Sequence, residues 1–190
     1  TPPQHSASAS PQIGYDDGFF IRSPDGQYGL SIAGRAQFDA IAYAAAREPG
    51  TDFMVRRMRL EFHGRFPGGK QFHLEPNFTP DGTEVEEAWL GFDVFEANAR
   101  LMFGRMKAPF GLEECSKQGN IDFPRFSIVH QFSPAEDHGV FLYGNTPSKQ
   151  FGYNIAAYNG TGNSDTNSSK DVGARALYRP FVGDESSALK

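Results

Sequence analysis

Arginine residues at alternate positions are the strongest chemical signal in the sequence. Arg57 and Arg59 alternate with apolar residues in segment 53–66, and Arg35 holds an equivalent position in segment 28–42. Side chains at alternate positions of a β-strand lie on one face of the sheet. Guanidinium groups bind anionic oxygen atoms through paired hydrogen bonds and stay charged at every physiological pH. The pattern therefore predicts a polar face that attracts anions.

Carboxylates offer these arginines a second role. Asp39, Glu61 and Glu75 occupy polar positions of the same segments. Opposite charges on neighbouring strands stabilise a sheet. The two roles are compatible, and the sequence leaves both open. Arg56 falls at an apolar position, so we expect it either to extend toward a polar boundary or to lie at a β-bulge.

Other reactive side chains form no recognisable motif. His63 and His73 share the polar positions of consecutive segments, but two imidazoles without a third ligand do not define a metal site. Cys115 has no neighbouring group that would activate a thiolate, and a single cysteine excludes an internal disulfide. We therefore expect no catalytic residue, no metal and no cofactor.

The elements that position these residues are short and alternating. They form a series of alternating segments separated by turn residues such as Pro24-Asp25-Gly26 and Pro67-Gly68-Gly69. We expect strands at 18–22, 28–42, 53–66, 72–78, 85–94, 99–106, 139–144, 150–158 and 171–179. Many are close to the length of about 9–11 residues that a tilted membrane strand needs.

Composition supports an all-β fold. The 190 residues include 21 Gly, 13 Pro and 18 Phe, which is typical of many turns joining aromatic strands. The net charge of −5 disfavours a nucleic-acid partner. No apolar run is long enough for a spanning helix, whereas a transmembrane β-barrel stays open because its strands show only alternation. Residues 1–16 are polar and are expected to form a flexible mature N-terminus.

A long segment without alternation interrupts the strand pattern at about 107–138. It contains Phe110, Phe126 and Phe132 among several prolines. A loop of this length within a compact domain is either functional or a sign of a wrong assignment. The alternative is an ordinary surface loop, but that would leave these phenylalanine rings in water, which is costly. In a barrel, we expect it to fold inward and narrow the pore.

Three runs of residues carry a family resemblance. Residues 53–64 resemble the RRxRLxFxG strand of the phosphate-selective porins O and P. Residues 104–113 are similar to that family's GRxKxPFGLE entry into its constriction loop, and residues 34–39 to its GRxQFD strand. The matches occur in the family's order across about residues 18–144.

The resemblance implies an antiparallel 16-stranded porin barrel in the outer membrane of a Gram-negative-type bacterium. It further implies a homotrimer, surrounded by outer-membrane lipid, that admits small anions such as phosphate. Residues 17–190 would form barrel strands. Because 190 residues are too few for 16 strands, we expect an N-terminal part of a larger porin. Lys107, inside the matched loop entry, and Arg125, within the loop, join Arg35, Arg57 and Arg59 as predicted pore-lining residues.

Two other functions fit the alternation. A soluble β-sandwich that binds carbohydrate would place one strand face on its core and expose the other. A β-barrel hydrolase would need catalytic groups that show no motif here. Selectivity also has an opposing signal, since Glu113 and Glu114 lie beside the loop entry of an acidic chain. Charges at the narrowest point outweigh distant ones, so the sequence predicts a mild preference for anions.

Overall fold

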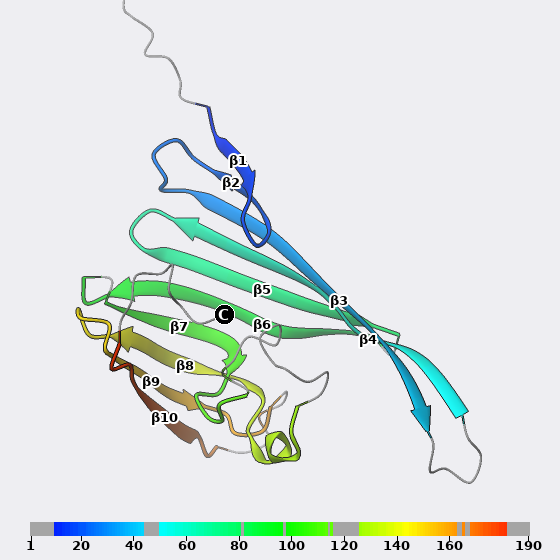
Figure 1. Cartoon of the computed structure of the whole chain (residues 1–190). Helices are drawn as coiled ribbons and strands as arrows, with labels where there is room; N and C mark the ends of the chain where they lie inside the picture. Colours follow the sequence, from blue (N-terminus) through cyan, green and yellow to red (C-terminus); the bar gives the residue numbers. More distant parts are fainter. Residues whose placement is uncertain are drawn as a thin grey trace, which may run out of the picture. The chain divides into compact units, whose positions relative to one another are not determined.

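The structure of the protein is a computed structural model that describes residues 10–43, 50–80, 82–96, 98–113, 115, 126–162, 165 and 168–181. The described residues form ten antiparallel strands in one sheet, and the strands follow one another in sequence order (Figure 1). The strands are β1 Gln12–Tyr15, β2 Phe19–Arg22, β3 Gly29–Tyr43, β4 Gly50–Phe66, β5 Lys70–Thr79, β6 Gly82–Val94, β7 Ala99–Lys107, β8 Glu136–Asn145, β9 Phe151–Tyr158 and β10 Asp171–Tyr178. The only other regular element described is a 3₁₀ turn at Ile128–Phe132. The predicted all-β, antiparallel fold is confirmed.

The chain divides into two compact units. Unit 1 comprises residues 1–67 and 71–88, and unit 2 comprises residues 68–70 and 89–190. Most of β1 to β5 and the beginning of β6 belong to unit 1. The end of β6 and all of β7 to β10 belong to unit 2. Among the described residues, no helix has the length and apolar character needed to cross a membrane.

A β-bulge in β4 sets the orientation of its side chains. Gln37 of β3 pairs with Arg57, whereas the next residue, Phe38, pairs with Val55. Arg56 is therefore the extra residue that opposes no residue of its own. The bulge explains how Arg56 departs from the alternation of its neighbours, which confirms one of the two expectations from the sequence.

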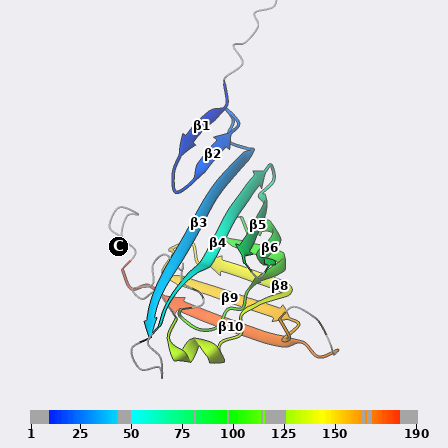
Figure 2. The same ribbon diagram turned by 90° about the vertical axis from the view of Figure 1, so that its right-hand side faces the viewer.

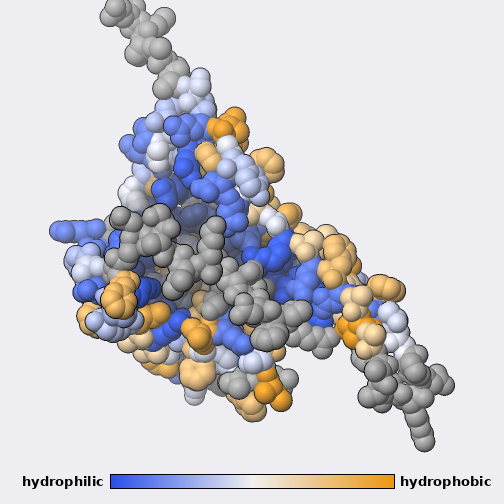
Figure 3. Space-filling view, in the orientation of Figure 1, coloured by the Kyte–Doolittle hydropathy of each residue, from blue (hydrophilic) through white to orange (hydrophobic). Residues whose placement is uncertain are grey.

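The two faces of the β3–β4 pair differ in polarity. One carries apolar cross-strand pairs such as Ile32 with Phe62. The other carries Ser31 opposite His63, with charged residues further along. Figure 3 shows hydrophilic surface over the strands of unit 1, with hydrophobic residues along its edge. The apolar residues are the exposed ones here, and Phe38 and Phe53 keep 71% and 80% of their surface accessible. The alternation predicted from the sequence is confirmed along both strands.

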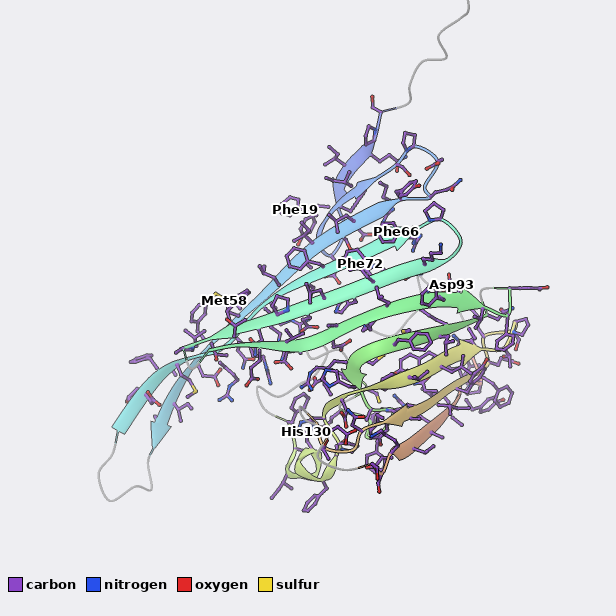
Figure 4. All side chains as sticks on the ribbon, turned by 180° about the vertical axis from the view of Figure 1, so that it is seen from behind. Phe19, Met58, Phe66, Phe72, Asp93 and His130 are labelled. Carbon is purple, nitrogen blue, oxygen red and sulfur yellow. The ribbon has the colours of Figure 1, made fainter. Side chains whose placement is uncertain are left out.

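Aromatic rings gather in unit 1 near the turn that joins β4 and β5. The ring centroids of Tyr28 and Phe66 lie 6.4 Å apart. Those of Phe66 and Phe72, both labelled in Figure 4, lie 5.9 Å apart. Gly64 makes room for this cluster, because a Cβ atom at that position would lie 1.9 Å from a ring atom of Phe72. A side chain at residue 64 would therefore displace an aromatic ring.

Unit 2 has an apolar core on one face of its strands. Its strands β8, β9 and β10 run side by side (Figure 2). The core residues are Met102, Met106, Ala108, Phe141, Ala156 and Tyr158, with Trp89 and Tyr143 packed against them. The opposite face carries Phe103, Val140 and Ile155, all of them exposed. Both faces of this unit are thus rich in apolar residues.

The N-terminal boundary differs from the expectation. Strand β1 lies within segment 1–16, which the sequence indicated to be flexible. It pairs with β2 through Ile13 opposite Ile21, and the Tyr15 and Phe19 rings meet edge to face at 5.3 Å. Four residues are too few to show alternation above the polar background. Residues 1–9 lie outside the described residues.

Candidate functional site

The polar face of unit 1 brings three of the predicted arginines together. The register places Arg35 directly opposite Arg59, and Arg57 one pair further along the same face, opposite Gln37. Like charges that oppose each other across a strand pair destabilise a sheet. Carboxylates from neighbouring positions are therefore needed to hold this row.

Arg59 is the most enclosed member of the row and has two carboxylate partners. Only 6% of its surface is accessible. Its Nη1 donates to Glu75 Oε1 at 3.0 Å, and its Nη2 donates to Glu86 Oε1 at 2.5 Å. Asn77 Nδ2 donates to the same Glu86 oxygen at 2.9 Å. The buried guanidinium is thus neutralised and held in one orientation.

The other arginines of these two strands are less enclosed than Arg59. Arg35 lies 3.8 Å from Glu61, and both side chains are about one-third exposed. Arg57 Nη1 donates to the neutral amide oxygen of Gln37 at 2.7 Å. The bulge directs Arg56 to Asp39, with which it forms an ion pair. Glu61 and Glu75 are therefore confirmed as carboxylate partners of Arg35 and Arg59, and Asp39 pairs with Arg56.

Two members of the hydrogen-bond network around Arg59 were missed by sequence reasoning, namely its partner Glu86 and Asn77, which donates to Glu86. Glu86 belongs to the acidic run Glu84-Val85-Glu86-Glu87, whose carboxylates fall at both parities of the strand, so its face was not evident. Asn77 lies beside Pro76 in β5. It also accepts a hydrogen bond from the backbone N–H of Met58 at 3.2 Å. The acidic run was the one signal that pointed to this region.

The beginning of the long loop packs on the core face of unit 2. Ala108 and Pro109 are fully buried there. A Cβ atom at Gly173 of β10 would lie 3.1 Å from Pro109 Cγ, which shows how closely the loop approaches the sheet. The hydroxyl of Tyr143 donates to the backbone carbonyl of Lys107 at 3.2 Å. The loop entry is therefore fixed to one face of the strands.

The aromatic residues of the loop behave differently from its entry. Phe110 and Phe132 are both largely exposed among the described residues, although the sequence indicated that they need cover. The small residue Ala108 and the rigid residue Pro109 hold the loop entry instead. Phe126 stacks on His130 at 4.0 Å between centroids (Figure 4 marks His130 in the 3₁₀ turn).

Two predicted residues are not part of the arginine row. Lys107 ends β7 in unit 2, opposite Glu136, and the alternation of β7 places it with Phe103 rather than with Met102 and Met106. Its role in a pore stays a prediction. Arg125 lies outside the described residues.

The distribution of polarity in unit 1 is the reverse of that in a soluble protein. Arg59, Glu75 and Asn77 are buried, whereas Phe38 and Phe53 are exposed. Charged residues are rarely buried in soluble domains unless they are paired, and large contiguous apolar surfaces are seldom left in water. A sheet with an apolar outer band and a polar inner face is the arrangement of a transmembrane barrel.

Comparison with protein families agrees with this barrel-like arrangement. The model of the family "Phosphate-selective porin O and P" matches residues 30–188. The chain belongs to this family. The match covers most of the described strands, the arginine row and the long loop, and it confirms the resemblance that the three sequence motifs carry. The family is one of outer-membrane channels. A search of curated proteins found no match to this porin.

Proposed function

We propose that this porin forms a water-filled outer-membrane channel for small hydrophilic solutes, with a preference for anions such as phosphate. The observation that carries the proposal is the reversed polarity of unit 1, where charged residues are enclosed and apolar residues are exposed. Family membership supports the channel, and the family's name supports the anion preference.

Guanidinium groups on one face support passage of anions. Several weak sites let an anion enter and leave, whereas one strong site would trap it. Arg35 and Arg57 suit this role better than Arg59, because Arg59 is buried against two carboxylates. The overall charge of −5 opposes anions only weakly, since charges beyond about 8 Å are largely screened at physiological salt.

Reversal potentials in a salt gradient test the selectivity. The purified full-length protein is expected to show mild anion preference in planar bilayers. Replacing Arg57 and Lys107 together with Ala should shift the reversal potential toward cations. Replacing both by Lys and Arg, respectively, should keep its sign. Lys170→Ala is the control, because Lys170 pairs with Asp165 outside the strands. A cation-selective parent channel contradicts the anion preference and leaves a general porin.

The long loop is proposed to narrow the channel. Support comes from its entry, where Ala108 and Pro109 pack on the core face of unit 2. Deleting residues 116–125 is expected to raise single-channel conductance. Resistance of the variant to unfolding in detergent serves as the control for an intact sheet. Unchanged conductance in a variant of undiminished resistance means that the loop lies outside the pore.

The exposed apolar residues are proposed to contact outer-membrane lipid and the neighbouring subunits of a homotrimer. Partition into detergent, followed by mass measurement of the protein–detergent particle, tests both statements. A protein that stays dispersed and monomeric without detergent would instead fit a soluble, carbohydrate-binding β-sandwich. No feature of the described residues favours that alternative.

A further inference from the structure

A hollow of about 420 Å³ lies on unit 2, where β7 begins and β8 ends. Four of its lining residues form one row across four strands, since Arg100 pairs with Tyr143, Tyr143 with Asn154, and Asn154 with Arg175. Gly152 contributes no side chain beside the row, and a Cβ atom there would lie 3.0 Å from Asn145. The hollow is therefore built by the register of the strands.

Most charged groups of the hollow already have partners. Arg100 Nε donates to Asp93 Oδ1 at 2.8 Å (Figure 4 marks Asp93 on β6). Arg179 Nη1 donates to Asn145 Oδ1 at 3.1 Å. Arg175 and its cross-strand neighbour Asn154 have no hydrogen-bond or ion-pair partner among the residues that the structure describes. Two adjacent polar groups thus face the hollow with their bonding capacity unused.

The charge of the hollow contrasts with that of the arginine row in unit 1. Three guanidinium groups line it against one carboxylate, Asp93, which leaves two positive charges uncompensated. Arg59 of unit 1, by comparison, meets two carboxylates. An anion of charge −2 would neutralise the hollow.

The spread of these charges favours an extended anion. Arg100 and Arg175 are three strand spacings apart, which is about 14 Å between their backbones. Arg179 follows Arg175 by four residues. A guanidinium group binds a planar carboxylate through two parallel hydrogen bonds. Two separated carboxylates match separated guanidinium groups better than one compact anion does.

The remaining polar groups suit hydroxyls. The amides of Asn98, Asn145 and Asn154 line the hollow, and an amide both donates and accepts hydrogen bonds. The volume lies in the range of small-molecule sites, about 300–1,000 Å³. We propose that this hollow binds a small hydroxylated dicarboxylate. The inference rests on the proposed channel function, since it gives that channel a solute class.

Calorimetric titration of the detergent-solubilised full-length protein with malate tests the proposal without any channel measurement. Arg175→Leu is expected to weaken malate binding by about tenfold or more, because it removes a charge-assisted pair of hydrogen bonds. Arg105→Leu is the matched control, because Arg105 belongs to the same unit but does not line the hollow. Asn154→Leu should weaken malate binding more than succinate binding, since succinate lacks the hydroxyl.

The outcomes separate the inference from the channel. Absence of malate binding overturns the inference. Equal binding of malate and inorganic phosphate, both lost in Arg175→Leu, also overturns it and assigns a general anion site. Malate binding without conductance in potassium chloride refutes the channel alone, and conductance without malate binding refutes the inference alone.

Discussion

Units 1 and 2 bury one face of their strands by different means. In unit 1 the buried groups of β4 and β5 are polar, and Arg59 is held by Glu75 and Glu86. In unit 2 the buried groups are Met102, Phe141 and other apolar residues, next to the buried loop residue Ala108. Similar alternating strands therefore enclose charges where each charge finds a partner, and apolar side chains where a loop packs on them.

The largest expected effect is the loss of charge compensation in unit 1. Replacing Glu75 and Glu86 with Gln leaves Arg59 buried without a carboxylate, which should lower the free energy of unfolding by about 3–5 kcal/mol. Glu61→Gln should cost below about 1 kcal/mol, because its pair with Arg35 is partly exposed. Urea titration in detergent micelles measures both.

A triple variant tests whether the uncompensated charge of Arg59 causes this loss of stability. Adding Arg59→Met to the double variant removes the uncompensated charge and should recover part of the lost stability. If the double variant is as stable as Glu61→Gln, the polar network of unit 1 does not stabilise its buried face.

The next effect concerns the exposed face of unit 1. Leu60→Arg should cost about 2–4 kcal/mol if the residue lies near the middle of the bilayer. Glu61→Gln, on the opposite face, is the control. The measurement is the yield of refolding into lipid vesicles. Equal losses at residues 60 and 61 would contradict the assignment of faces.

A smaller effect is expected at the loop contact of unit 2. Gly173→Ala adds a Cβ atom 3.1 Å from Pro109, so it should cost about 1–3 kcal/mol through overpacking. Gly29→Ala is the matched control in a strand of unit 1, because the nearest atom to its Cβ, Cγ of Arg22, would lie 3.7 Å away. Thermal unfolding in detergent compares the two. If Gly173→Ala keeps the stability of the parent protein while Gly29→Ala loses stability, the contact between the loop and β10 is not tight.

The smallest effect lies in the turn between β2 and β3. A hydrogen bond from the Ser23 hydroxyl and another from the Gln27 backbone N–H lower the pKa of Asp25. Any stabilisation by this carboxylate is therefore present above its ordinary pKa and is lost as the pH falls through the lowered pKa. Ser23→Ala should raise the pKa of Asp25 toward its ordinary value, as measured by its carboxyl ¹³C shift in micelles. An unchanged pKa would show that the Ser23 hydroxyl does not interact with the carboxylate.

Much of the fold could be predicted from the sequence, because the alternation of apolar and polar residues in a long strand shows which residues lie on each face. The segments expected at 28–42 and 53–66 correspond closely to β3 and β4. The bulge at Arg56 was one of the two explanations that the sequence offered for a charged residue at an apolar position. Strand β1 was missed because four residues contain too little pattern.

Less of the candidate site than of the fold could be predicted from the sequence. Partners in adjacent strands, such as Arg35 and Glu61, follow from alternation once the register is known. The link between Arg59 and Glu86 depends on how β6 is oriented, which an acidic run with carboxylates at both parities does not reveal. The hollow around Arg175 gathers residues from 93 to 179, and no local motif marks it.

The bulge at Arg56 has a consequence for insertions and deletions in this strand. Deleting one residue from a strand normally turns every later side chain to the wrong face. Deleting Arg56 instead joins Val55, opposite Phe38, directly to Arg57, opposite Gln37, so both faces keep their present register. The loss is the ion pair with Asp39, which retains a hydrogen bond from Gln37 at 3.0 Å. Residue 56 is thus the position at which β4 tolerates a change in length.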